Sequence, residues 1–309
     1  MPVPTLVASA NGAVGMDAAW DVLAGGGSAL DAVEVAARLV EDEPTDHTVG
    51  YGGYPNLLGE VELDASIMEG TTRRAGAVGA LRGYRAAVTV ARAVMERLPH
   101  VLVVGDGAAK LADEIGLVPE DLLTDEAERV WRAGLEGSLP EGSLGARMLS
   151  VVASMATDPE RAAGTVNFLA VDGEGRMASA VSTSGWAWKY PGRLGDTPVI
   201  GAGNYCDDRY GAAACTGFGE LSVRASTART VVAALAAGAG VEHAARDAVR
   251  DLFLLGMPVD QVIMHLVAVD RDGNHTAVTT RPGATYVHRS LGMTSHEESP
   301  RVVVEGALS

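Results

Sequence analysis

A threonine at the start of a predicted strand is the residue of this sequence best suited to nucleophilic chemistry. A polar stretch, residues 158–163, leads into Gly164-Thr165, and a strand-like apolar run follows directly. Cleavage of the Gly164–Thr165 bond would leave Thr165 with a hydroxyl nucleophile and an α-amine to act as its base. A Gly-Thr pair is also an ordinary junction between a turn and a strand, so the prediction depends on its context.

Two charged residues further along the chain could hold the ends of an amino-acid substrate. Arg193 can bind a carboxylate in bidentate fashion. Asp196, three residues later, can bind an ammonium group, and glycines at 192 and 195 frame the pair as a shaped loop. The alternative is a local Arg–Asp pair on the surface, which contributes little to stability.

These residues occur in an order that resembles a known family. With Thr216-Gly217 they are similar to the N-terminal-nucleophile hydrolases, specifically the glycosylasparaginase, plant-type asparaginase and isoaspartyl peptidase family. The resemblance extends over about residues 6–230, and the combination of motifs is specific. The other segments that carry it are Gly-Gly-Gly-Ser-Ala-Leu-Asp-Ala-Val-Glu at 25–34, Val-Gly-Tyr-Gly-Gly-Tyr-Pro-Asn at 49–56 and Leu-Asp-Ala-Ser-Ile-Met at 63–68.

The resemblance implies a self-processing enzyme that hydrolyses an amide at an aspartyl β-carbonyl. Cleavage between Gly164 and Thr165 would give an α chain of residues 1–164 and a β chain of residues 165–309. Thr165 would be the catalytic nucleophile, and a neutral α-amine with a pKa near neutrality would serve as its base. Thr183 matches the family's second threonine, whose hydroxyl contacts the nucleophile. Its alternative role is that of a β-branched residue in a strand.

The resemblance also assigns the residues that bind the substrate. Arg193 would hold the α-carboxylate of the aspartyl unit, and Asp196 its α-ammonium. The Thr216 hydroxyl and the Gly217 amide match the family's oxyanion hole, which stabilises the tetrahedral intermediate. Glycines at 217 and 219 allow the backbone to approach the substrate closely. Thr-Gly-x-Gly is otherwise an ordinary turn sequence.

Three positions depart from the family pattern. Gly164 stands where glycosylasparaginases have Asp, as it does in plant-type asparaginases. Asn167 stands where the family commonly has Gly, on the same face as Thr165, where it could hydrogen-bond the nucleophile or crowd it. Asn11 matches the position of a Trp that shapes the leaving-group side in glycosylasparaginases. We therefore expect a roomier site that hydrolyses both GlcNAc-asparagine and small β-aspartyl compounds, including asparagine.

The leading interpretation is a glycosylasparaginase-like enzyme, an N4-(β-N-acetylglucosaminyl)-L-asparaginase. The alternatives are an L-asparaginase or isoaspartyl dipeptidase, and an unprocessed, non-catalytic homologue that only binds. Nucleotide binding rests on Gly105-Asp106-Gly107, but Lys110 replaces the third glycine of a dinucleotide loop and Asp106 would repel phosphate. A plain strand–helix turn explains that sequence better.

Composition excludes several other classes of protein. The 309 residues carry 40 acidic and 24 basic side chains, a net charge of −16, which argues against nucleic acid and anionic membranes as partners. No apolar run is long enough to span a membrane, and we expect a cytoplasmic protein. Cys206 and Cys215 are expected to be reduced thiols. The seven scattered histidines form no metal-binding pattern, so we expect no metal and no cofactor.

The pattern of helices and strands predicts a single α+β domain over residues 1–309. Two hairpins, 168–182 and 262–280, share Ala-Val-Asp before a glycine turn and are expected to be neighbours. The resemblance implies a four-layer αββα sandwich of two mainly antiparallel sheets flanked by helices, and homodimers of αβ units. Residues 138–163 are expected to be an exposed linker. The expected helices are 14–24, 28–41, 80–97, 119–137, 146–155, 221–238 and 241–255, and the remaining strands are 4–8, 61–66, 100–104, 286–290 and 301–305.

Overall fold

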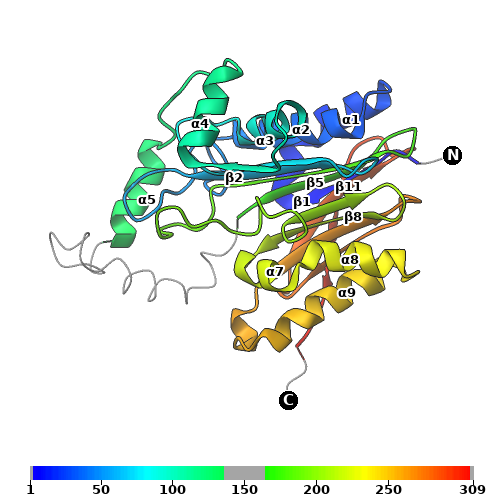
Figure 1. Cartoon of the computed structure of the whole chain (residues 1–309). Coiled ribbons are helices and arrows are strands. Elements are labelled where there is room, and N and C mark those ends of the chain that lie inside the picture. Colours follow the sequence, from blue (N-terminus) through cyan, green and yellow to red (C-terminus); the bar gives the residue numbers. More distant parts are fainter. Residues whose placement is uncertain (1–2, 136–163, 307–309) are drawn as a thin grey trace.

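The computed structural model of the protein describes residues 3–135 and 164–306. Two β-sheets lie face to face, and helices cover the outer face of each, which confirms the predicted four-layer sandwich (Figure 1). Over the larger sheet lie α1 (Ala13–Ala24), α2 (Ala29–Glu41), α3 (Ala87–Arg97) and α4 (Gly105–Glu114). Over the smaller sheet lie α7 (Gly219–Ala225), α8 (Thr227–Ala236) and α9 (Val241–Leu252).

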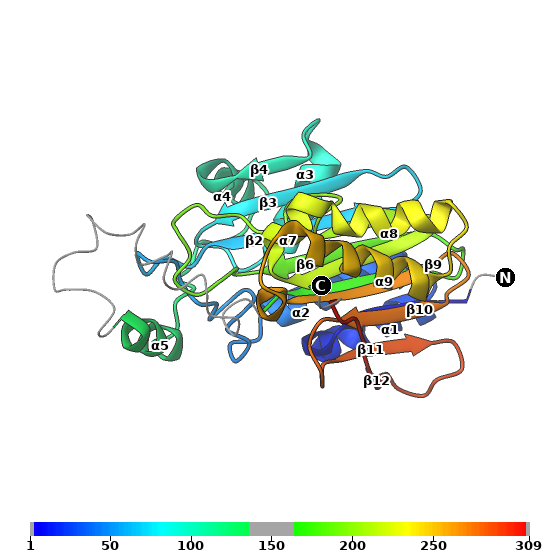
Figure 2. The same ribbon diagram turned by 90° about the horizontal axis from the view of Figure 1, so that it is seen from below.

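The larger sheet has the strand order β12-β11-β1-β5-β6-β2-β3-β4 and is antiparallel except for its β3–β4 pair. Its central strand β5 pairs with β1 on one side and with β6 on the other. Figure 2 shows β3 and β4 at one edge of the molecule and β11 and β12 at the opposite edge. The bounds are β1 (Thr5–Ser9), β2 (Leu63–Glu69), β3 (Ala75–Leu81), β4 (Leu102–Val104), β5 (Val166–Val171), β6 (Met177–Thr183), β11 (Thr285–Ser290) and β12 (Glu297–Pro300).

The smaller sheet has the order β13-β10-β9-β8-β7, with a parallel β10–β13 pair at one edge. Both predicted hairpins form, but β5–β6 belongs to the larger sheet and β9–β10 to the smaller one. They are therefore not neighbours in one sheet, because the fold stacks them in opposite layers. The bounds are β7 (Asn204–Asp207), β8 (Gly211–Gly217), β9 (Met264–Asp270), β10 (His275–Thr279) and β13 (Val302–Val303).

Small and branched apolar side chains let these layers approach closely. The inner face of α2 consists of alanine and valine, and Ala32, Val33 and Ala36 are completely buried against the larger sheet. Strands β5 and β6 are buried along their whole length, because helices cover one face and the smaller sheet covers the other. Burial of this apolar surface is the main driving force for the stacking.

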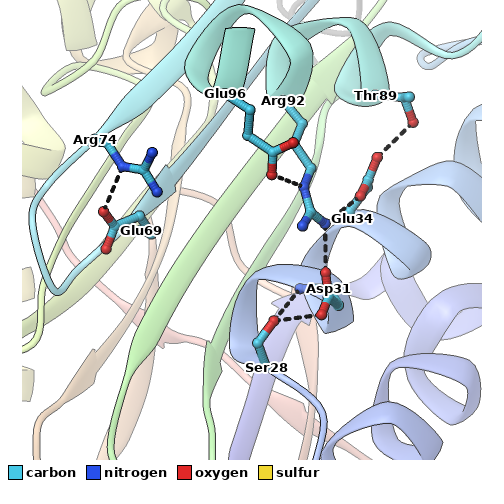
Figure 3. A network of polar contacts seen from close by, with 8 residues as sticks. All are labelled: Ser28, Asp31, Glu34, Glu69, Arg74, Thr89, Arg92 and Glu96. Atoms are coloured by element: carbon cyan, nitrogen blue, oxygen red, sulfur yellow. Dashed lines mark hydrogen bonds and ion pairs between the residues drawn. The ribbon is translucent and has the colours of Figure 1, made fainter.

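A network of polar contacts joins α2 to α3 on the outside of the helical layer (Figure 3). Arg92 in α3 donates hydrogen bonds to Asp31 and Glu34 of α2, at 2.7 and 2.6 Å, and to Glu96 in its own helix. Ser28 caps α2 by accepting a hydrogen bond from the Asp31 amide, as the sequence predicted. The network fixes how the two helices lie over the sheet.

A buried carboxyl connects the helical layer to the strand that carries Thr183. Glu41 accepts hydrogen bonds from the Val88 amide of α3, at 2.8 Å, and from the Ser182 hydroxyl of β6, at 2.7 Å. Burial raises the pKa of Glu41 to about 8, so the group is mainly protonated at neutral pH. Ser182 directly precedes Thr183, the last residue of β6. The hydrogen bond from Ser182 to Glu41 therefore fixes the end of the strand that carries Thr183.

Several predicted elements differ from the structure. The helix expected over 80–97 begins only at Ala87, because residues 75–81 form β3. The strand expected to be buried at 100–104 is instead the edge strand β4, where Leu102 and Val104 are exposed. The helix expected over 221–238 is divided at Ser226, whose φ of 50° breaks it into α7 and α8.

Other differences concern elements that were not predicted or lie outside the described residues. Strands β7, β8 and β12 were missed, and the helix expected over 119–137 is α5 (Asp125–Leu135). The linker expected at 138–163, with its short helix at 146–155, falls in the part that is not described. Cys206 and Cys215 are free thiols on the β7–β8 hairpin, and they lie in different hydrophobic clusters, one between the sheets and one beneath the outer helices.

Candidate active site

The Gly164–Thr165 bond lies immediately before the central strand of the larger sheet. Thr165 is 8% exposed and directly precedes β5. Gly164 has a φ of 149°, and a Cβ built on it would lie only 2.1 Å from the Cβ of Thr48. Only glycine therefore fits between Thr48 and the start of the strand.

Two threonine hydroxyls converge on the carbonyl oxygen of Gly164. The Oγ1 of Thr165 lies 2.8 Å from this oxygen, and the Oγ1 of Thr183 donates to it at 2.7 Å. The hydroxyl of Thr183 also accepts a hydrogen bond from the Gly185 amide at 2.8 Å, which fixes its orientation. The end of β6 thus brings the Thr183 hydroxyl to the same carbonyl oxygen that the Thr165 hydroxyl contacts.

A small cavity of about 10 Å³, room for one water molecule, lies on one side of Thr165. Arg193, Asp196 and Gly217, which were predicted to bind substrate, line it together with Thr165 and Thr183. The loop of residues 190–197 and the end of β8 therefore bring together residues that are far apart in the sequence. Trp186 completes the lining and was not predicted to be there.

Arg193 is held by a residue that the sequence analysis missed. Its Nε and Nη2 donate to the two carboxylate oxygens of Glu220 at 2.9 and 2.7 Å, a bidentate pair. Its guanidinium lies over the ring of Trp186, 4.5 Å from the centroid, and Phe218 packs edge-on against that ring. The surface pair considered between Arg193 and Asp196 does not form; the partner of Arg193 is Glu220.

The Asp196 carboxyl lines the small cavity together with Arg193. Its side chain is buried, and within the described parts of the chain its Oδ2 has no hydrogen-bond partner. Burial raises the pKa of Asp196 to about 6, although the nearby Arg193 opposes the shift. Gly219 packs directly on this carboxylate, since a Cβ there would lie 2.7 Å from Oδ1. Gly219 therefore supports Asp196, although it does not line the cavity.

A much larger cavity of about 720 Å³ opens on the other side of Thr165. Thr216, the predicted oxyanion residue, lines this cavity, whereas its neighbour Gly217 lines the small one. Asn11, in the 3-10 helix η1 (Ala10–Gly12), also lines the large cavity. Thr165 therefore lies at the junction of two cavities of very different size.

Asn11 and Asn167 are both held by hydrogen bonds. Asn11 donates to Asp46 at 2.8 Å and accepts from the Ser9 hydroxyl at 2.7 Å. The side-chain oxygen of Asn167 accepts from the Ser9 amide at 2.9 Å. Within residues 3–135 and 164–306, Asn167 makes no hydrogen bond to Thr165. Its side chain ties β5 to β1.

The two tryptophans near the site have different environments. Trp186 and Trp188 are two residues apart but do not share one face of a strand, because residues 184–190 do not form one. Trp188 packs beside α5 and donates to the Trp131 carbonyl at 3.0 Å, whereas Trp186 contacts Arg193. Thr48, which packs on Gly164, was also missed, although it directly precedes the glycine-rich motif at 49–56.

The described residues offer no group of three or more His, Cys, Asp or Glu side chains that could hold a metal ion. Among the same residues, no helix is long and apolar enough to cross a membrane. The side chains that line the two cavities at Thr165 offer hydroxyls, an amide, carboxylates, the imidazole of His265 and the guanidiniums of Arg193 and Arg301.

Two stacked sheets with helices on both outer faces, and a threonine ahead of the central strand, are the architecture of an amidohydrolase with the N-terminal-nucleophile hydrolase fold. The sequence profile of the family described as asparaginase matches residues 10–295. The chain therefore belongs to the asparaginase family.

Curated relatives carry three different names. An N(4)-(Beta-N-acetylglucosaminyl)-L-asparaginase from Elizabethkingia miricola is 37% identical over 89% of this chain and 78% of its own length. A plant-type L-asparaginase from Pyrococcus furiosus is 36% identical over 88% of this chain and 86% of its own. An isoaspartyl peptidase/L-asparaginase from Mus musculus is 39% identical over 74% of this chain and 66% of its own.

Proposed function

We propose that this protein is a self-cleaving threonine amidohydrolase that hydrolyses β-aspartyl amides and is glycosylasparaginase-like. One observation carries the proposal: Thr165 lies between a small cavity lined by Arg193 and Asp196 and a large cavity lined by polar residues. The walls of the small cavity carry the charges that the two ends of an aspartyl unit require, but this cavity holds only about 10 Å³ and must widen to admit them. The large cavity has room for a leaving amine. Among the relatives, the names glycosylasparaginase, asparaginase and isoaspartyl peptidase fit this arrangement.

Self-cleavage begins with attack of the Thr165 hydroxyl on the carbonyl carbon of Gly164. A C–O bond forms, the C–N bond breaks, and the hydroxyl proton is transferred to the nitrogen that becomes the new α-amine. Thr183, which donates to the same carbonyl oxygen at 2.7 Å, stabilises the negative charge that develops there. Water then hydrolyses the ester, giving chains of 164 and 309 − 164 = 145 residues.

In the cleaved enzyme, the α-amine of Thr165 accepts the hydroxyl proton as the oxygen attacks the β-carbonyl carbon of the substrate. The amine departs with that proton, and water hydrolyses the aspartyl ester to release aspartate. The Thr216 hydroxyl and the Gly217 amide bind the oxyanion. Asp196 binds the substrate ammonium, and its buried Oδ2 supports this role because it has no other partner among the described residues.

Arg193 binds the α-carboxylate, with its orientation fixed by Glu220. Because Nε and Nη2 already donate to Glu220, the guanidinium offers Nη1 to the substrate. A Cβ built on Gly195 would lie 3.0 Å from Nη1, so this nitrogen points along the glycine-framed wall of the small cavity. The proposal also includes homodimers of αβ units, which rest on the resemblance, and a cytoplasmic location, which the two free thiols favour.

The test follows cleavage and hydrolysis together. Intact-mass measurement of the wild type should show two chains divided after Gly164, and the cleaved protein should release aspartate from asparagine or GlcNAc-asparagine. Thr165→Ala should remain a single inactive chain, whereas Thr165→Ser, which keeps a hydroxyl, should still be cleaved. A wild-type chain that stays whole and hydrolyses neither substrate would support a binding protein instead.

A further inference from the structure

Arg301 is a buried cation on the wall of the large cavity. It lies between β12 and β13 and is 7% exposed. The same cavity is lined by Thr165 and Thr216. Within residues 3–135 and 164–306, Arg301 has no carboxylate within ion-pair distance, whereas Arg193 and Arg289 each have one. A buried charge without a counter-ion is costly, so its position calls for an explanation.

The contacts of Arg301 leave part of its guanidinium available. Its Nε donates to the Thr285 carbonyl at 2.7 Å, and Nη1 donates to the Leu266 carbonyl at 3.2 Å. Both acceptors are neutral backbone carbonyls, one on β11 and one on β9. The side chain therefore links the two sheets, and neither contact supplies a negative charge to balance the guanidinium. Nη2 makes no hydrogen bond to any described residue. The guanidinium is therefore held through Nε and Nη1, and the N–H groups of Nη2 can still donate hydrogen bonds to a ligand in the cavity.

Arg301 is the positive charge among the residues that line the cavity, which also include the carboxylates of Glu43 and Asp46. His265 also lines the cavity, and burial together with Arg301 and Arg281 lowers the pKa of its imidazole to about 4, so it is neutral at pH 7. Burial lowers the pKa of Arg301 to about 10, which leaves the guanidinium protonated. Arg281 donates to the Asp260 carbonyl and does not line the cavity. Arg301 is therefore the positive charge that a ligand in this cavity would meet.

Two carboxylates on the cavity lining, Glu43 and Asp46, do not neutralise Arg301. Asp46 is already fully engaged by Asn11 and by the amide and hydroxyl of Thr48. The Glu43 carboxylate accepts from the amide and hydroxyl of Thr45 and faces solvent, where its charge is screened. The positive charge of Arg301 therefore has no partner carboxylate among the residues that line the cavity.

We propose that Arg301 forms a carboxylate-binding subsite for the leaving amine, so that the preferred substrates are β-aspartyl peptides with one to three residues after the scissile amide. This inference rests on the proposed function. The leaving amine would occupy the large cavity, because the small one, of about 10 Å³, has room for only one water molecule. A carboxylate there would receive hydrogen bonds from a guanidinium that has no counter-ion. A neutral sugar would leave this charge unpaired.

The length of the leaving peptide determines whether its C-terminal carboxylate reaches Arg301. Each added residue extends the chain by roughly 3.3–3.6 Å at most. A series with leucine, glycyl-leucine and glycyl-glycyl-leucine as leaving groups, each as free acid and as C-terminal amide, therefore probes the distance from Thr165. Acid and amide have nearly the same shape, so the charge is the main difference between them.

The experiment measures kcat/KM for each acid and amide pair on the cleaved enzyme. At one or more lengths, the wild type should favour the acid by roughly tenfold or more. Arg301→Gln should reduce this ratio to about one, and Arg301→Lys, which keeps the charge, should retain part of it. Arg281→Gln, a nearby arginine that does not line the cavity, is the matched control and should keep the wild-type ratio.

The ratio separates recognition from a structural role. Loss of the link between β9 and β11 would slow acid and amide substrates equally, and the amide's intrinsic leaving ability is the same for every variant. The inference would be overturned if the wild type did not prefer the acid at any length. It would also be overturned if Arg301→Gln kept the wild-type ratio of kcat/KM between acid and amide. In that case, hydrolysis of asparagine or GlcNAc-asparagine would still support the proposed function; hydrolysis of no β-aspartyl amide would overturn both.

Discussion

The two cavities beside Thr165 differ in size, charge and rigidity. The small one holds about 10 Å³ and is bounded by Arg193, Asp196 and glycines packed against them. The large one holds about 720 Å³ and is lined mainly by hydroxyls, amides and backbone. The difference indicates that the protein specifies one half of its substrate closely and the other half loosely. Substitutions in the small cavity should therefore cost far more activity than those in the large one.

The largest effect should come from Arg193→Ala. Removal of a buried, charge-assisted contact to the substrate costs roughly 2–5 kcal/mol, so kcat/KM for asparagine should fall at least about thirtyfold. Self-cleavage should continue, because the Gly164–Thr165 peptide bond has no free α-carboxylate to hold. Steady-state kinetics and intact-mass measurement check the two halves of this prediction.

Arg209→Ala is the matched control for this change. Arg209 makes a bidentate pair with Asp207, as Arg193 does with Glu220, but it lies on the surface away from both cavities. Its loss should leave kcat/KM close to the wild-type value. Near-normal kinetics in Arg193→Ala would show that the substrate carboxylate binds elsewhere, and the contrast between the cavities would then fail.

The next effect concerns pH and Asp196. Burial raises the pKa of this carboxyl to about 6 in the free enzyme. As the pH falls through 6, Asp196 gains a proton and loses the charge that binds the substrate ammonium, so kcat/KM should fall about tenfold per pH unit below that value. As the pH rises above 6, this contribution should level off.

The pH profile of Asp196→Asn separates this group from the α-amine of Thr165, which titrates nearer neutrality. The variant should have a lower kcat/KM at every pH. The fall in kcat/KM below pH 6 that belongs to Asp196 should be absent from its pH profile. Profiles of the same shape in the wild type and the variant would assign the acid limb to another group. The small cavity would then not owe its selectivity to Asp196.

The smallest effect should come from Asn11→Trp in the large cavity. An indole there would fill space and offer a flat apolar surface, so we expect changes of only a few fold in kcat/KM for asparagine and a larger shift for GlcNAc-asparagine. Asn11→Ala is the control, because it removes the hydrogen bonds to Ser9 and Asp46 without filling the cavity. A loss in Asn11→Trp as large as that of Arg193→Ala would show that the large cavity is as closely specified as the small one.

The residues predicted from sequence are those that stand in ordered motifs. Thr165, Thr183, Arg193 and Asp196 are set off by strand starts and glycines, and the structure gathers them around the small cavity. The same signals placed the β5 and β6 hairpin and the first two helices. Which sheet each hairpin joins was not predictable, because both hairpins carry Ala-Val-Asp before a glycine turn and stacking depends on contacts distant in the chain.

The residues that were missed act through tertiary contacts. Glu220 follows the Thr-Gly-x-Gly motif, but its role depends on Arg193, 27 positions away. Arg301 lies beyond the region of family resemblance, in the segment 301–305, which was predicted only to be a strand. Strand β2 is buried on both faces, and its buried residues include Asp64 and Ser66. The sequence could not show this, because these polar residues alternate with apolar ones as they do on a strand that has one face in solvent.

The strand order of the larger sheet has a consequence for how the molecule can be assembled. Strand β1 lies between β11 and β5, and β2 lies beside β6, so strands from before and after Gly164 alternate across the sheet. Cleavage would leave these hydrogen-bonded neighbours in place, and the two chains would remain interlocked. Once denatured, however, they would have to find each other by diffusion, so refolding would become a second-order process that depends on concentration. If the chain is cleaved as proposed, a single chain folds first and is divided afterwards, and the divided form is a product of that history.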